Sequence, residues 1–70
     1  MPVVQVHIKE GRSPTQRREL VRRITQDLVE VCGAAEDRVH VIINEVPMDQ
    51  WGRGGALLSD IAAAEQASSE

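Results

Sequence analysis

Two runs of β-branched residues, separated by one long amphipathic segment, limit the folds that this chain can adopt. The first run occupies residues 1–8 and is predicted to be a β-strand, with apolar side chains at Val3, Val4, Val6 and Ile8. The second strand is predicted over residues 38–46, and Pro47 ends it. A strand, a long helix and a strand in a short chain indicate an α/β fold. We expect a single β-α-β unit with two parallel strands and a right-handed crossover.

The segment between the strands carries start and stop signals for a helix. Ser13 is suited to cap the N-terminus, Pro14 to fill the first helical position, and Gln16 to complete a capping box. Gly33 is suited to the C-terminal cap, so the expected helix covers Pro14–Cys32. Apolar side chains recur every three or four residues and share one face of this helix, namely Leu20, Val21, Ile24, Leu28 and Val31.

The rest of the chain is predicted to consist of shorter elements. The glycine-rich stretch over residues 51–55 predicts a tight hairpin. Residues 56–64 are expected to form a short helix or an arm, and residues 65–70, which are small and polar, a disordered tail. We therefore expect one domain over residues 1–64, followed by the tail.

A single copy of the predicted fold leaves apolar surface without a partner. A two-stranded sheet is not stable by itself, and its open edges invite pairing. Because side chains alternate along a strand, Val4 and Val41 fall on one face of the sheet while Val3 and Ile42 fall on the other. A chain of 70 residues with one Trp, no Phe and no Tyr builds only a thin core. We therefore expect an oligomer in which sheets join edge to edge and face to face.

Composition argues against several other classes of protein. The net charge is −3, and acidic residues interleave with the helix arginines, so nucleic acid is not an expected partner. The single cysteine cannot form an internal disulfide. No apolar run approaches the roughly 18 residues of a membrane span, and no secretory signal is visible. We therefore expect a cytoplasmic protein that does not bind a membrane.

Four features in the order found here resemble the 4-oxalocrotonate tautomerase family over about residues 2–58. They are Pro2 before an apolar strand, Glu10-Gly11-Arg12-Ser13, Val41-Ile42-Ile43-Asn44-Glu45 and Trp51-Gly52-Arg53-Gly54-Gly55. The resemblance implies a β-α-β fold assembled as a hexamer, a trimer of dimers, with active sites at subunit boundaries. It also implies a reaction without cofactor or metal. In that reaction an N-terminal proline amine acts as general base and moves a proton between carbons of an unsaturated 2-oxo acid.

The resemblance implies roles for individual residues. Pro2, once Met1 is removed, falls on the general base, and burial or a neighbouring cation would favour its unprotonated form. Arg12 falls on an arginine that holds a substrate carboxylate. Trp51 falls on an aromatic residue, usually Phe, that lines the pocket and keeps the base unprotonated. The expected partner is therefore a small anionic substrate.

The chain departs from the family pattern at His40. Tautomerases of this type usually have there a second arginine, supplied by a neighbouring subunit, and histidine lacks its permanent charge. Arg53, beside Trp51, is a second candidate source of that charge. Three interpretations follow: a tautomerase, a hydratase or dehalogenase that uses a protonated Pro2, and a non-catalytic subunit of a hexamer, either alone or with a paralogue.

Overall fold

The computed structural model describes residues 1–68 and has an elongated shape. It measures 51 × 25 × 17 Å with a radius of gyration of 16.5 Å. A compact domain of this length would have a radius of gyration of about 11 Å. The elements, in order, are β1 (Val3–Lys9), α1 (Pro14–Cys32), η1 (Glu36–Arg38), β2 (His40–Val46), η2 (Met48–Gln50), β3 (Gly52–Arg53), β4 (Ala56–Leu57) and α2 (Leu58–Ser68).

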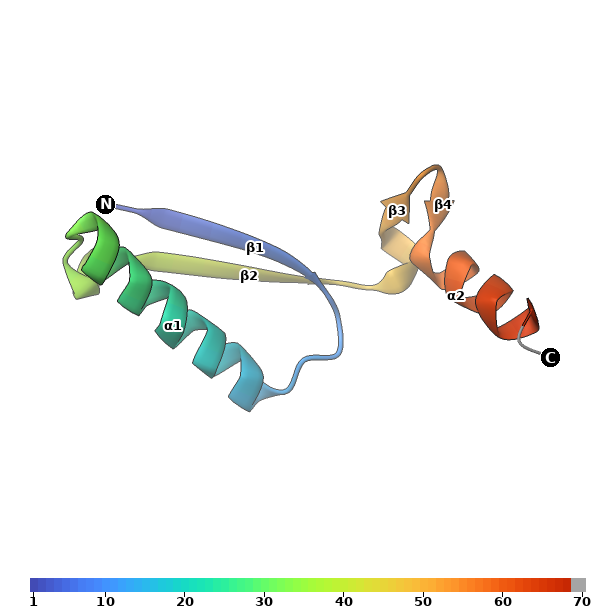
Figure 1. Cartoon of the computed structure of the whole chain (residues 1–70), viewed down its shortest axis with the longest axis horizontal. Coiled ribbons are helices and arrows are strands. Elements are labelled where there is room, and N and C mark those ends of the chain that lie inside the picture. The colour runs from blue at the N-terminus through green and yellow to red at the C-terminus, as the bar shows by residue number, and fades with distance from the viewer. Residues whose placement is uncertain (69–70) are drawn as a thin grey trace.

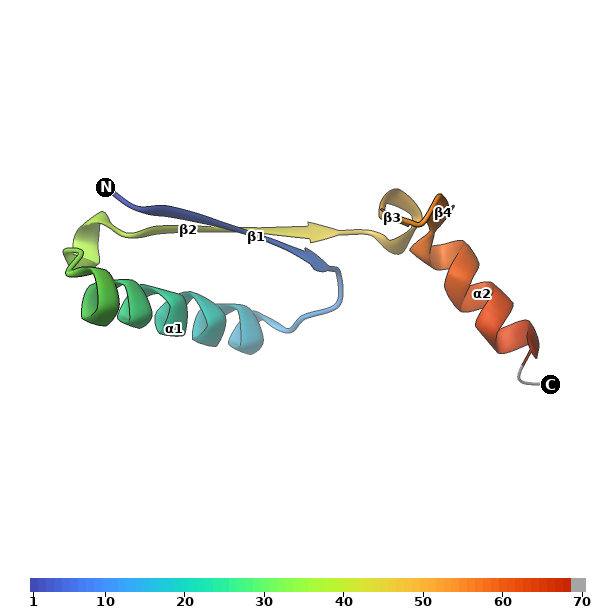
Figure 2. The same ribbon diagram turned by 45° about the horizontal axis from the view of Figure 1, so that its top comes forward.

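The predicted β-α-β unit is confirmed. Strands β1 and β2 pair in parallel, with Val3 opposite His40 at one end and Lys9 opposite Val46 at the other. Helix α1 lies along one face of this sheet and leaves the other face open (Figure 2). Because side chains alternate, the even-numbered residues of β1 and the odd-numbered residues of β2 are the more buried ones.

The ends of α1 lie where the capping signals predict them. The Gln16 amide donates to Ser13 Oγ at 3.1 Å, and the Ser13 amide donates to Gln16 Oε1 at 2.9 Å. At the other end, Gly33 adopts the left-handed conformation with φ 70°, and its N–H donates to the Val29 carbonyl at 3.1 Å. These bonds satisfy backbone groups that a helix end would otherwise leave unpaired.

The second strand begins two residues later than the sequence predicts. Residues 36–38 form the 3₁₀ turn η1, in which the Arg38 amide donates to the Ala35 carbonyl at 2.9 Å. The Val39 amide donates to the Glu36 carbonyl at 3.3 Å, so the turn uses the N–H groups of both Arg38 and Val39. Strand β2 starts at His40, whose amide donates to the Pro2 carbonyl at 3.0 Å.

The predicted hairpin is also confirmed. Strands β3 and β4 are antiparallel, and the two residues between them, Gly54 and Gly55, have φ values of 62° and 87°. Positive φ at both central positions is the requirement of a tight two-residue hairpin turn. Helix α2 then continues to Ser68, so residues 65–68 of the expected tail are helical; residues 69 and 70 lie outside the described part.

The hairpin and α2 lie at the end of the molecule opposite the N-terminus (Figure 1). Among residues 1–68, none is fully buried, and several apolar side chains are exposed, including Val3 at 54% and Ile42 at 44% on the open face of the sheet. A single chain therefore leaves this face, and the outer edges of its two-stranded sheet, without a partner. None of the helices within residues 1–68 is long and apolar enough to cross a membrane.

Candidate active site

Pro2 and His40 lie together at the N-terminal end of the sheet. The backbone bond from His40 to Pro2 extends the β1–β2 pairing by one residue, which fixes the position of Pro2. Pro2 is half-buried and His40 is exposed. Met1 precedes Pro2 in the chain, so the proline nitrogen is an amide, and it becomes a basic amine only when Met1 is removed.

Arg12 lies at the opposite end of β1, in the loop that leads into α1. Strand β1 spans seven residues, which corresponds to about 20 Å at about 3.3 Å per residue. The Arg12 guanidinium is exposed and has no hydrogen bond or ion pair with any residue of the described chain. It borders a pocket of about 230 Å³ lined also by Ile8, Gln16, Arg17 and Leu20. The first turn of α1, which begins here, has no acidic residue, so the positive end of the helix dipole favours an anion.

An ion pair between α1 and β2 holds the backbone of the Arg12 loop. Arg17 Nη1 lies 2.7 Å from Glu45 Oε1 and also donates to the Arg12 carbonyl oxygen at 2.6 Å. The Gly11 amide donates to Glu45 Oε2 at 3.2 Å. Burial raises the pKa of the Glu45 carboxyl, but hydrogen bonds from the Gly11 and Arg12 backbone and the charge of Arg17 outweigh it. The pKa therefore lies below its ordinary value.

Neither Arg17 nor Glu45 is among the residues predicted to act in the site. A signal for them is nevertheless present in the sequence. Alternation along β2 places Glu45 on the same face as Val41 and Ile43, the face that α1 covers. A carboxylate on a covered face needs a partner, and an arginine early in the facing helix is the residue type that supplies one.

Trp51 and Arg53 lie beyond the C-terminal end of β2. Trp51 is half-buried between η2 and β3, and its carbonyl accepts from the Leu58 amide at 2.9 Å. Arg53 is exposed in the hairpin. The N-terminus, which Pro2 adjoins, lies at the other end of the elongated molecule (Figure 1). Within one chain the fold therefore brings Pro2 close to His40 but not to Arg12, Trp51 or Arg53.

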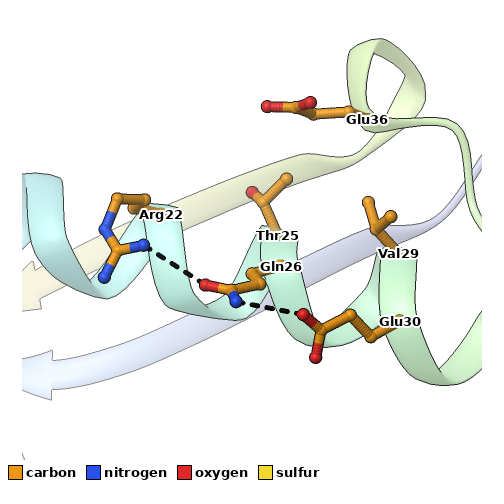
Figure 3. Close-up of a pocket in the computed structure, with 6 residues that line it drawn as sticks. All are labelled: Arg22, Thr25, Gln26, Val29, Glu30 and Glu36. Carbon is orange, nitrogen blue, oxygen red and sulfur yellow. Dashed lines mark hydrogen bonds between the residues drawn. The ribbon is translucent and has the colours of Figure 1, made fainter.

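A larger hollow than the one beside Arg12 lies elsewhere on the surface. It has a volume of about 510 Å³ and is lined by Arg22, Thr25, Gln26, Val29, Glu30 and Glu36, from α1 and η1 (Figure 3). Three of its polar side chains bond to one another, since Arg22 donates to Gln26 and Gln26 donates to Glu30. None of the five predicted site residues lines it, so we do not assign the active site there. Within residues 1–68, no three His, Cys, Asp or Glu side chains are grouped to hold a metal ion.

A family model described as a tautomerase enzyme matches residues 2–61 of this chain. The match spans the parallel strands, α1 and the C-terminal hairpin, and so includes all five predicted site residues. The chain therefore belongs to the tautomerase family, a class of isomerases, and the resemblance found in the sequence is confirmed. A probable tautomerase from Halalkalibacterium halodurans is 40% identical over 60 residues, covering 86% of this chain and 98% of that protein.

Other relatives agree in length and fold. The 2-hydroxymuconate tautomerase of Bacillus subtilis is 39% identical over 61 residues, covering 87% of this chain and 98% of that protein. The crystal structure of TomN, a 4-oxalocrotonate tautomerase homologue in the tomaymycin biosynthetic pathway, aligns with a TM-score of 0.85. It is 32% identical and covers 89% of this chain and 95% of that one. A heterohexamer 4-oxalocrotonate tautomerase from Chloroflexus aurantiacus aligns with a TM-score of 0.81 and 30% sequence identity. The alignment covers 87% of this chain and 98% of that one.

Proposed function

We propose that this chain is a cofactor-independent tautomerase that acts on an unsaturated 2-oxo acid or its enol, with the Pro2 amine as general base. Membership of the tautomerase family supports the reaction type. The observation that carries the assignment of the base is the backbone bond between His40 and Pro2, which anchors Pro2 at the end of β1. A base that is held in place loses little entropy when the substrate binds beside it.

The proposed reaction moves one proton. The Pro2 amine removes a proton from a carbon next to the carbonyl of a 2-oxo acid, or from the hydroxyl group when the substrate is an enol such as phenylenolpyruvate. The protonated amine then returns the proton to another carbon of the resulting enolate or dienolate. Arg12, whose guanidinium has no partner in the described chain, is suited to bind the substrate carboxylate with two parallel hydrogen bonds. Trp51 would exclude water from the base and so favour its neutral form. General base catalysis of this kind contributes about 10²–10⁴ in rate.

The proposed site requires more than one copy of the chain. A small acid cannot contact both Pro2 and Arg12 of one chain, because the length of β1, about 20 Å, separates them. We infer that Pro2 of one copy meets Arg12 and Trp51 of others. The unpaired sheet edges and the exposed Val3 and Ile42 supply a surface for such an assembly. A homohexamer is the assembly we propose, and a mixed hexamer with a paralogue is the alternative, in line with the Chloroflexus aurantiacus relative.

The role of Pro2 can be tested by controlling the terminus of the chain. We expect mass spectrometry of the native protein to show a chain that begins at Pro2. A form blocked by retained Met1 should lose at least about 10² in kcat/KM for phenylenolpyruvate, since general base catalysis contributes that much or more. The matched control is Pro2→Ala without Met1, which keeps a primary amine and should retain part of the activity. Full activity of the blocked form would rule out Pro2 as the base.

A further inference from the structure

We propose that the Arg17–Glu45 ion pair is a clamp that positions Arg12 for the substrate carboxylate. The inference rests on the proposed function, because it assigns a reason for the geometry of the Arg12 loop in that reaction. The clamp connects three parts of the fold, since Arg17 belongs to α1, Glu45 to β2, and the backbone that both contact to the loop between β1 and α1.

Every residue of this loop, residues 10–13, has a bonded backbone group. The Glu10 amide donates to the Val46 carbonyl at 3.0 Å and is the last bond between the two strands. The Gly11 amide and the Arg12 carbonyl then bond to the clamp instead, at 3.2 Å to Glu45 Oε2 and 2.6 Å to Arg17 Nη1. Ser13 bonds to Gln16 in the capping box. The clamp therefore supplies the bonds in the stretch between the end of the sheet and the start of the helix.

The backbone at Gly11 needs this support. Its φ of 117° lies in the region that residues with a side chain rarely adopt, and a Cβ there would meet no atom within 4 Å. Glycine is thus required by conformation and not by space. A glycine is also the most flexible residue in the unfolded chain, so without its bond to Glu45 the direction in which Arg12 points would be poorly defined.

The clamp also separates the roles of two arginines that border the same pocket. Arg12 and Arg17 both line the hollow of about 230 Å³. The charge of Arg17 is paired with Glu45, whereas Arg12 has no partner in the described chain. The pairing leaves Arg12 as the guanidinium that can bind an anion. The bond from Arg17 to the Arg12 carbonyl fixes the backbone from which the Arg12 side chain extends.

Steady-state kinetics with phenylenolpyruvate test this inference. Arg17→Gln and Glu45→Asp should each raise KM by about tenfold, less than the roughly hundredfold that a 1 Å misplacement can cost. We expect kcat and the pH–rate profile to stay the same, because only binding of the carboxylate is weakened. The matched control is Arg18→Gln, which removes the same charge from an exposed neighbouring residue. The Arg18 side chain has no hydrogen bond or ion pair with any residue of the described chain.

A second background separates positioning from general structure. In Arg12→Ala, the clamp substitutions should have no further effect on KM, because the group that they position is gone. If Arg17→Gln and Glu45→Asp fold but leave KM unchanged, the proposed clamp is wrong. It is also wrong if these substitutions raise KM by the same factor in the Arg12→Ala background. By contrast, an unchanged KM in Arg12→Ala alone would show that the proposed use of Arg12 is wrong.

A measurement without substrate tests the clamp even in variants that do not assemble into an active oligomer. Amide hydrogen exchange at Gly11 should be faster in Glu45→Asp than in the parent protein, and unchanged in Arg18→Gln, because only the former disturbs the bond to the Gly11 amide. Equal exchange at Gly11 in all three proteins would contradict the clamp whether or not the chain is active.

Discussion

Single residues decide the charge of the proposed site, and at His40 the resemblance to the family leads us to expect an arginine. His40 lies opposite Val3 at the start of β2, on the open face of the sheet, and its side chain is exposed. Histidine, unlike arginine, has no permanent charge. A missing donor for the developing oxyanion typically costs about 10²–10³ in rate.

Replacing His40 with arginine should therefore change the substrate preference. We expect His40→Arg to raise kcat/KM for a dicarboxylate 2-oxo acid more than for a monocarboxylate such as phenylenolpyruvate, because the added guanidinium can bind the second carboxylate. Kinetics with the two substrates, in parallel with an Arg38→Gln control on η1, provide the measurement. Equal gains, or a loss on both substrates, would show that His40 does not occupy the place of that arginine.

Residue signals in the sequence predicted local structure well and long-range pairing poorly. The capping box at Ser13 and the positive φ of Gly33 follow from neighbours within four residues, and both are confirmed. The Arg17–Glu45 pair joins residues 28 apart, and no local pattern indicates which arginine of the helix would take this position. The family motif predicted a role for Pro2 and Trp51 but not their separation along the molecule, because a motif gives order in the chain and not distance.

At the scale of elements, α1 carries a charged network on its outward face. Glu19 accepts from Arg22 Nη2 at 2.6 Å and from Arg23 Nε at 2.8 Å, one turn further along the helix. Hydrogen bonds from Arg22 and then Arg23 lower the pKa of Glu19 from 4.5 to about 2. The same pairing raises the pKa of Arg22. These are exposed pairs, so their effect on stability is small and decreases with added salt.

The lowered pKa gives a prediction for acid stability. A carboxyl whose pKa is lower in the folded state stabilises the fold at pH values above its unfolded pKa, and that contribution is lost as pH falls through the folded pKa. For Glu19 this window runs from about 4.5 down to about 2. Glu19→Gln should therefore show a smaller fall in Tm across this window than the parent protein. Calorimetry checks this, with Glu30→Gln on the same face as control; equal slopes would contradict it.

At the scale of the whole molecule, the chain has the proportions of a part and not of a complete globule. Its radius of gyration of 16.5 Å exceeds the value of about 11 Å for a compact chain of this length, and no described residue is fully buried. The sequence predicted this need for partners from the two apolar faces of the sheet. It did not predict that the hairpin and α2 extend at the end opposite Pro2, because no residue pattern fixes their direction (Figure 1).

The separation of Pro2 from Arg12 along β1 allows two defective proteins to complement each other. A chain blocked at Pro2 still supplies Arg12, and an Arg12→Ala chain still supplies Pro2. The two variants are unfolded, mixed in equal amounts and refolded together. If each site of a symmetric oligomer takes Pro2 and Arg12 from different copies, each residue is intact in half of the sites, so both are intact in about a quarter of them. Activity of the mixture, compared with each variant refolded alone, measures this fraction. A mixture no more active than the average of its components would place both residues of each site in one chain.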